Sequence, residues 1–308
     1  MRALVTGSLA ILGLIGCGDD GGKTATPDAA DNGFAPPDKV MHANDETGAG
    51  VWMDLGPADL TCLNTPNADV ATPAGGTTLN TVVKDFQSDK EVHDAMVTAF
   101  DGVNVNSPFG AATTSDAMGK VTVAIPAGIK RFGFKMVGGA QGADTQLDTF
   151  LLNQTFETSA AEQTSPELLS VSNSTAQLLP ALIGEPRTAG TGVLAGALRD
   201  CAGHEMSNFV AAVSSTQGTA TLIPGAATYY FSATSQPLPQ KHGKVPYGSS
   251  NGLYMIIQIP ATENAYVQMW GFKSDADLAS GNMSLVAELK VPVVADSVVT
   301  GSYAPLRQ

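Results

Sequence analysis

Histidine is scarce in this chain, which leaves little material for the catalytic and metal sites that depend on it. The four histidines are His42, His93, His204 and His242, and no two of them lie at a spacing typical of metal ligands. A zinc site needs three or four converging nitrogen, sulfur or oxygen ligands. The sequence also lacks the G-x-S-x-G, S-x-x-K and H-E-x-x-H motifs, and it has no glycine-rich phosphate loop leading into a helix. We therefore expect no catalytic residues, no metal and no cofactor.

Charge is also sparse, and most of it is of one sign. Charged residues make up 15% of the chain, with 16 Lys and Arg against 29 Asp and Glu, for a formal net charge of −13. A strongly negative chain is repelled by nucleic-acid phosphates and by anionic lipid headgroups. The composition therefore excludes nucleic acid as an expected partner.

Long apolar runs are missing, apart from one at the N-terminus. Residues 3–15 are apolar except for Thr6, Ser8 and two glycines, and they follow the positive Arg2. Such a run fits the h-region of a signal peptide, about 7–15 residues, and is shorter than the roughly 20 residues that span a bilayer. The run ends in Leu14-Ile15-Gly16-Cys17.

This ending resembles the lipobox of bacterial lipoproteins, in which a peptidase cuts before a lipid-modified cysteine. The resemblance implies a lipoprotein signal peptide at 1–16 and lipidation of Cys17. The alternative is an ordinary signal peptide with a cysteine nearby. Several acyl chains, at about 0.8 kcal/mol per buried CH₂, hold a protein firmly on a membrane. We expect a lipid-anchored location in the cell envelope, at the outer membrane, facing the periplasm or the surface.

Residues 17–60 have no sustained hydrophobic periodicity and are rich in Gly, Ala, Pro and Asp. This composition is typical of disordered segments, which like charges extend further. We therefore predict a lipidated, disordered tether over 17–60. An acidic calcium site is the alternative, but the D-x-D-x-D-G spacing of an EF-hand loop is missing.

Two cysteines remain once Cys17 is assigned to lipid. Cys62 and Cys201 form an even pair in an exported chain, which favours a disulfide between them. That bond would join the end of the tether to the second half of the chain. Two free buried thiols are the alternative, because the sequence does not fix the distance between them.

The two halves of the chain share a pattern of short strands and turns, which indicates an internal duplication. Residues 82–97 have the pattern of a strand, an Asp-containing turn and a second strand, and residues 197–211 repeat it. Each half continues with a glycine turn, an alternating strand and a proline, at 116–128 and at 251–261. Period-two alternation is typical of half-buried antiparallel strands.

This order of elements resembles the carboxypeptidase regulatory-like domain, a prealbumin-like (transthyretin-like) β-sandwich. The family motif at the start of the second strand is matched by residues 91–97. Its Asp-x-x-Gly turn and Ile-Pro-x-Gly ending are matched by 116–119 and 125–128, whereas the second copy has no glycine turn after Pro260. The resemblance implies a mainly β fold with two antiparallel sandwich domains, at 77–157 and 191–308.

The stretch between the copies, 158–190, has a different pattern. Ser165-Pro166-Glu167 is typical of a helix start, an apolar face follows, and Gly184 is typical of a helix end. We predict a helical connector over 158–190, with one or two short helices that break near Asn173 or at Pro180. We also expect a final strand near Val298–Tyr303.

The loop at 235–250 is basic and rich in proline within an acidic chain, and it contains Lys241, His242 and Lys244. Loops on sandwiches often carry recognition, so these three residues are candidate ligand contacts. A long solvated connection is the alternative.

An intradiol dioxygenase is the enzymatic alternative, because that class uses a related sandwich and holds iron with two tyrosines and two histidines. Tyr229, Tyr230, Tyr247 and His242 lie in the second half, but no histidine follows His242. Iron would therefore lack a ligand.

Together these features predict a non-enzymatic cell-envelope lipoprotein whose tandem β-sandwich modules serve adhesion, scaffolding or ligand display. Its expected partners are the membrane, through the lipid, and an envelope protein or glycan. The alternative is a peptide- or carbohydrate-binding lipoprotein that uses the basic loop 235–250 or the groove between the modules.

Overall fold

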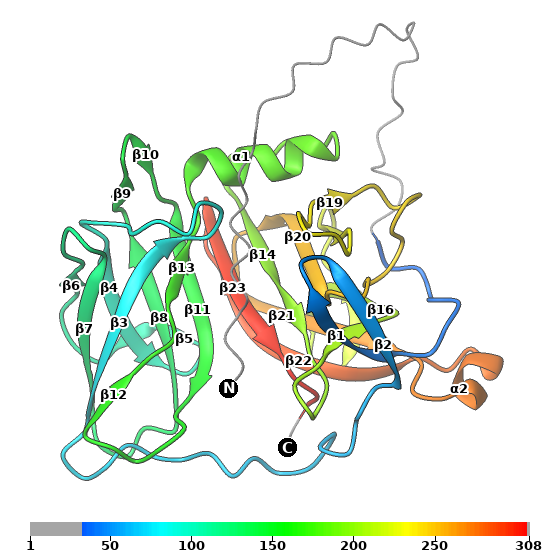
Figure 1. Ribbon diagram of the computed structural model, residues 1–308, viewed down its shortest axis with the longest axis horizontal. Coiled ribbons are helices and arrows are strands. Elements are labelled where there is room, and N and C mark those ends of the chain that lie inside the picture. The colour runs from blue at the N-terminus through cyan, green and yellow to red at the C-terminus, as the bar shows by residue number, and fades with distance from the viewer. Residues whose placement is uncertain (1–32, 307–308) are drawn as a thin grey trace, which may run out of the picture.

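The computed structural model in Figure 1 is mainly β, as the sequence predicts, and it describes residues 33–306. Strands account for 51% of the residues and helices for 6%. The expected signal peptide 1–16, Cys17 and the tether as far as residue 32 lie outside the described residues. Within 33–306, neither helix has the length and apolar character needed to cross a bilayer.

The first repeat consists of two small sheets that face each other. Its strands are β3 (Thr77–Asp85), β4 (Met96–Asp101), β7 (Lys120–Ile125), β8 (Arg131–Val137), β11 (Asp148–Thr155) and β13 (Leu168–Ser170). In one sheet β3 pairs with β7 antiparallel and with β13 parallel, and in the other β4, β8 and β11 pair antiparallel. The alternating apolar residues of both sheets, among them Val83, Val123 and Phe134, form a common core.

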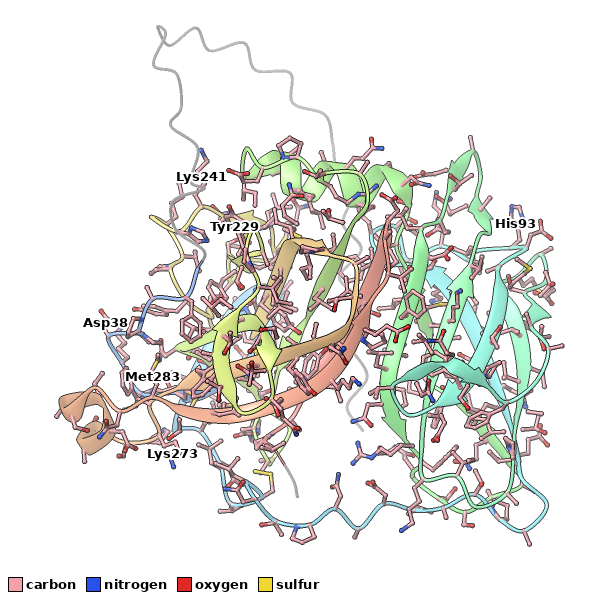
Figure 2. All side chains as sticks on the ribbon, turned by 180° about the vertical axis from the view of Figure 1, so that it is seen from behind. Asp38, His93, Tyr229, Lys241, Lys273 and Met283 are labelled. Carbon is pink, nitrogen blue, oxygen red and sulfur yellow. A yellow bond between two sulfur atoms is a disulfide. The ribbon has the colours of Figure 1, made fainter. Side chains whose placement is uncertain are left out.

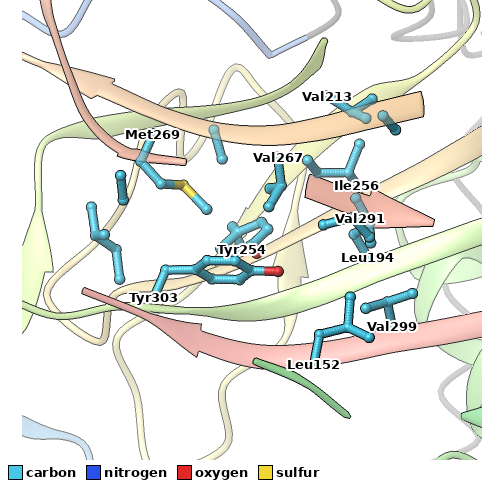
Figure 3. Packing of buried hydrophobic residues seen from close by; sticks show 14 of the residues in the cluster. Leu152, Leu194, Val213, Tyr254, Ile256, Val267, Met269, Val291, Val299 and Tyr303 are labelled. Atoms are coloured by element: carbon cyan, nitrogen blue, oxygen red, sulfur yellow. The ribbon is translucent and has the colours of Figure 1, made fainter. Parts of the chain in front are cut away.

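The second repeat has the same pairing pattern. Its strands are β14 (Thr191–Leu198), β16 (Phe209–Thr216), β20 (Leu253–Pro260), β21 (Thr262–Gly271), β22 (Ser284–Val293) and β23 (Ser297–Tyr303). Here β14 pairs with β20 antiparallel and with β23 parallel, while β16, β21 and β22 pair antiparallel. Figure 3 shows the core between these sheets, with Leu194 and Ile256 facing Val267 and Val291. The duplication indicated by the sequence is therefore present in the structure, and β23 occupies the region expected for the final strand.

The turns at Gly119 in the first repeat and at Gly252 in the second have the same backbone hydrogen bond. The backbone N–H of Val83 donates to the carbonyl oxygen of Gly119, and the N–H of Leu198 donates to that of Gly252, at 2.8 and 3.0 Å. Both glycines have positive φ, 70° and 66°. A Cβ on Gly119 would lie 2.5 Å from the Val83 carbonyl oxygen, and one on Gly252 2.7 Å from that of Leu198. Each turn therefore requires glycine, for its backbone angle and for its close approach.

The two repeats share one sheet, which the sequence did not predict. Strand β23 pairs in parallel with β14 on one side and with β11 of the first repeat on the other. Figure 1 shows β23, in red, between these strands. The result is a ten-stranded sheet that includes β5 (Asn104–Pro108), β6 (Thr113–Thr114), β18 (Ala227–Phe231) and β19 (Pro239–Gln240). The expected separate sandwiches are therefore joined through β23.

Smaller elements complete the fold. They are β9 (Ala140–Gln141), β10 (Asp144–Thr145), β17 (Thr219–Leu222) and α2 (Asp275–Ser280).

The expected helical connector over 158–190 is helical only in part. Residues before 171 form β12 (Glu162–Thr164) and β13, both paired with β3, and the helix α1 runs from Asn173 to Leu182. The helix begins after Ser172, whose hydroxyl accepts a hydrogen bond from the N–H of Thr175, and it contains Pro180. The start predicted at Ser165 is wrong because Leu168 enters the core of the first repeat and is fully buried.

The expected disordered tether is wrong for residues 42–57. These residues form a hairpin of β1 (His42–Gly48) and β2 (Val51–Pro57), and β1 also pairs with β15 (Glu205–Ser207). Met41 is buried in the core of the second repeat, and the Asn44 amide donates to the Ser207 hydroxyl at 3.0 Å. A few anchoring side chains therefore order a segment whose overall composition is typical of disorder.

Candidate functional site

The structure brings Cys62 and Cys201 together in a disulfide, with an S–S distance of 1.98 Å and 5.7 Å between the Cα atoms. Backbone hydrogen bonds surround it. The N–H of Cys201 donates to the carbonyl oxygen of Asp59 at 2.9 Å, and the N–H of Asp59 donates to the Asp200 carboxylate at 3.1 Å. The bridge therefore fixes the segment after β2 to the tip between β14 and β15. Cys17, the expected lipid site, lies outside the described residues.

The basic loop is only partly available to a ligand. Lys241 and Lys244 are exposed, and Figure 2 shows Lys241 at the molecular surface. His242 is buried, so its assignment as a ligand contact is wrong. Its Nε2 lies 2.7 Å from the carbonyl oxygen of Thr228, and its ring stacks on Tyr229 with centroids 4.5 Å apart. The sequence places His242 among polar neighbours, and only the return of the loop to β18 buries it.

The tyrosines and the histidine of the dioxygenase alternative have contacts within the protein, and Tyr247 donates a hydrogen bond to Asp38. The rings of Tyr229 and His242 stack with an interplanar angle of 7°. The hydroxyl of Tyr230 donates to the carbonyl oxygen of Gly33 and accepts from the N–H of Ala211. Over the described part of the chain, no group of three or more His, Cys, Asp or Glu is placed to hold a metal ion.

A groove of about 870 Å³ lies where the two repeats meet, and it is the main candidate site. It opens where β11 and β23 stop pairing, because their ladder covers only Asp148–Leu151 against Ser297–Thr300. The ends of β11 and β23 form part of its wall, and residues 66–69, β22 and residues 304–306 complete it. Its lining includes Asn153, Gln154, Thr155, Thr300, Ser302 and Tyr303, with Arg131, Asp69 and Glu288 at its sides.

A β-bulge in β11 opens this groove. The pairing of β11 with β8 shifts register between Leu151 and Gln154, and Asn153 has a positive φ of 55°. The N–H of Asn153 donates to the carbonyl oxygen of Gly102 at 3.0 Å, which holds the bulge toward the first repeat. Bulges increase local twist and end pairing. The extra residue therefore turns β11 away from β23 and leaves a space between them.

The charged groups of the groove have partners within the protein. Arg131 and Asp69 form a two-point ion pair, with Nε–Oδ2 and Nη2–Oδ1 distances of 2.6 and 3.0 Å. Glu288 accepts hydrogen bonds from the N–H of Gly218 and the amide of Gln268, both at 2.7 Å. The rest of the lining combines hydroxyl and amide side chains with apolar ones, such as Leu152, Leu289 and Leu306. The groove therefore offers hydrogen-bonding groups and little strong positive charge.

Tyr303 is the aromatic residue of the groove lining, and it faces the core instead of the opening. Its side chain is only 8% exposed and packs near Tyr254, with ring centroids 6.1 Å apart. Burial raises the pKa of the Tyr303 phenol to about 12. The phenol therefore stays protonated at neutral pH and presents neither a base nor a flat ring to a ligand.

The sequence did not indicate Asn153 or Ser302 as site residues. An extra residue in a strand interrupts the alternation only locally, and Asn-Gln in a strand region carries no distinctive signal. The groove between the modules was expected as a general possibility, and its lining depends on a pairing between strands about 150 residues apart.

No protein-family model matches the chain, and no curated protein does either. Solved structures with some similarity include the Bacillus anthracis TIE protein, at 8% identity and a TM-score of 0.25, covering 75% of this chain and 34% of that one. The shaft pilin SpaA of Lactobacillus rhamnosus GG has 10% identity and a TM-score of 0.23, with 77% and 98% covered. The Bacillus cereus major pilin subunit BcpA has 10% identity and a TM-score of 0.21, with 75% and 99% covered.

This chain spans about a third of the length of the TIE protein. With TM-scores this low, these likenesses establish neither a detailed fold nor a function for this chain.

Proposed function

We propose that this chain is a non-enzymatic cell-envelope lipoprotein whose two joined β-sandwich units form one body for adhesion, scaffolding or ligand display. The observation that carries the proposal is the pairing of β23 with a strand of each repeat. Any hinge motion between the repeats would have to break one of these ladders, and backbone ladders open only at a cost in free energy. A fixed spacing between two units is the property that a scaffold or display module requires.

The lipid on Cys17 would hold this body at the membrane, at the outer membrane in our proposal, facing the periplasm or the surface. Its partners would then be the membrane itself and an envelope protein or glycan. The net charge of −13 supports the exclusion of nucleic acid.

Complementation of a strain that lacks the chain tests this proposal. Wild-type chain should incorporate labelled fatty acid, sediment with membranes and restore surface attachment or resistance to detergent. Cys17→Ala should fractionate as soluble protein and fail to restore either property. Thr24→Ala, from the same segment, is the matched control and should behave as wild type. Full rescue by Cys17→Ala would contradict the role of the lipid.

A second candidate function is binding of a peptide or carbohydrate, and the groove favours it. Ligand pockets typically measure about 300–1,000 Å³, and the groove falls within that range. Peptide and glycan arrays probed with the purified chain test this function. Loss of a signal in Thr155→Trp would assign binding to the groove, and loss in Lys241→Ala with Lys244→Ala would assign it to the basic loop. The absence of any array signal would contradict the binding function.

A further inference from the structure

Among residues 33–306, no strand lies beside the groove-facing edge of β23 beyond Thr300. Its ladder with β14 continues to Tyr303 opposite Leu198, whereas its ladder with β11 ends at Thr300 opposite Leu151. The last part of β23 is therefore paired on one side only. A strand edge of this kind presents backbone N–H and C=O groups that can pair with an added strand.

The orientation of these backbone groups follows from their neighbours. The carbonyl oxygen of Tyr303 accepts a hydrogen bond from the N–H of Arg199, and the carbonyl oxygen of Gly301 lies against Gly196 of β14. Backbone groups of successive residues in a strand point to opposite edges. The N–H and C=O of Ser302 therefore face the groove, where Ser302 is exposed.

The opposite wall of the groove is formed by the last residues of β11. The Asn153 bulge turns β11 aside, and the side chains beyond it, Gln154 and Thr155, are polar and at least partly exposed. Bulges next to functional sites commonly end pairing or redirect side chains. Two parallel strands that separate after four paired residues therefore enclose a polar slot in the sheet itself.

We propose that this slot binds an extended peptide segment, which adds a strand to the free edge of β23 at Ser302. This inference rests on the proposed binding function and names its ligand class. Strand addition uses main-chain hydrogen bonds for affinity. A carbohydrate is disfavoured because the one aromatic ring of the lining, Tyr303, is buried. Arg131 is paired with Asp69, which leaves the negative charge of Glu288 in the lining, so the bound segment is neutral or basic.

The test pairs two substitutions at Ser302 in the full chain, purified in detergent and screened against a phage-displayed library of random linear peptides. Ser302→Ala keeps the backbone N–H and removes only the hydroxyl, so selected peptides should bind it within about threefold of wild type. Ser302→Pro removes the N–H that faces the groove while the β14 ladder keeps its bonds. We expect it to weaken binding by about tenfold, as the loss of a backbone hydrogen bond predicts.

A second variant keeps the test decisive if Ser302→Pro does not fold. Thr155 is exposed on the opposite wall, so Thr155→Trp should fill the slot and abolish peptide binding without disturbing a ladder. N-methylation of alternate amides in a selected peptide should weaken binding in the same way as Ser302→Pro.

Peptides that bind folded Ser302→Pro as tightly as wild type would overturn strand addition. Glycan binding that Thr155→Trp abolishes, without any peptide binding, would overturn this inference and leave the binding function standing. If the chain bound neither a peptide nor a glycan, both the inference and the binding function would be overturned.

Discussion

Phe150 of β11 and Val299 of β23 lie opposite each other in parallel register, and both side chains are buried in the core of the second repeat. The first repeat therefore contributes an aromatic ring to the core of the second. We predict that Phe150→Ala lowers the free energy of unfolding by about 3–5 kcal/mol, as for other buried phenylalanines. Because the core is shared, urea unfolding followed by circular dichroism should remain a single transition.

Phe86→Ala is the matched control for this prediction, since Phe86 belongs to the same repeat and is 46% exposed. Phe86→Ala should change the free energy of unfolding by no more than about 0.5 kcal/mol. A Phe150→Ala protein that unfolds in two separate steps would contradict the shared core.

The disulfide closes a loop between residues that are 139 positions apart. Replacing both Cys62 and Cys201 by serine should lower the free energy of unfolding by about 2–4 kcal/mol, because the unfolded chain gains conformational freedom. Thermal unfolding measures this loss. A reductant should destabilise the wild type similarly and leave the double variant unchanged. A wild type whose unfolding temperature is insensitive to complete reduction would contradict the prediction.

Substitutions at the buried and the exposed residues of the basic loop should differ in their effect on stability. His242→Ala removes the contact with the Thr228 carbonyl and the stack on Tyr229. We therefore expect it to lower the free energy of unfolding by about 1–3 kcal/mol. Lys241 is exposed in the same loop, so Lys241→Ala should change the free energy of unfolding by less than about 0.5 kcal/mol. Urea unfolding at neutral pH compares the two. Equal free energies of unfolding for the two variants would contradict the structural role of His242.

Asp296 lies in the turn that leads into β23, and its pKa is held below its ordinary value. The N–H of Gly190 donates to its carboxylate at 3.0 Å, and Arg187 approaches the same oxygen at 2.6 Å. A depressed folded-state pKa gives stability that is present above the unfolded pKa, near about 4, and lost as the pH falls through the folded value. Asp296→Asn should therefore reduce the fall in stability between pH 6 and pH 3, measured by urea unfolding. An identical pH profile in both proteins would contradict this role.

Features with local causes could be predicted from the sequence. Val121, Val123 and Ile125 alternate over a half-buried strand, the glycine turns repeat, and the β-branched Val298 and Val299 lie in the final strand. These patterns sufficed for a mainly β fold and an internal duplication, because they depend on residues close in the chain.

Features with distant causes could not be predicted. The short apolar run at Leu168 fits a strand and a helix equally well, and only its place beside β3 decides between them. The pairing of β11 with β23, the Asn153 bulge and the burial of His242 all depend on contacts between separate parts of the chain. The groove arises from the β11–β23 pairing and the Asn153 bulge, so its residues carry no signal in the sequence.

Native-state hydrogen exchange, followed by mass spectrometry at increasing urea, tests most directly whether the repeats form one body through β23. Peptides from β8 and β11 report on the first repeat, and peptides from β14 and β21 report on the second. We predict that the slowest amides of both repeats show the same urea dependence, because β23 links their opening. Opening of the first repeat at lower urea, while β14 and β23 stay protected, would contradict the account.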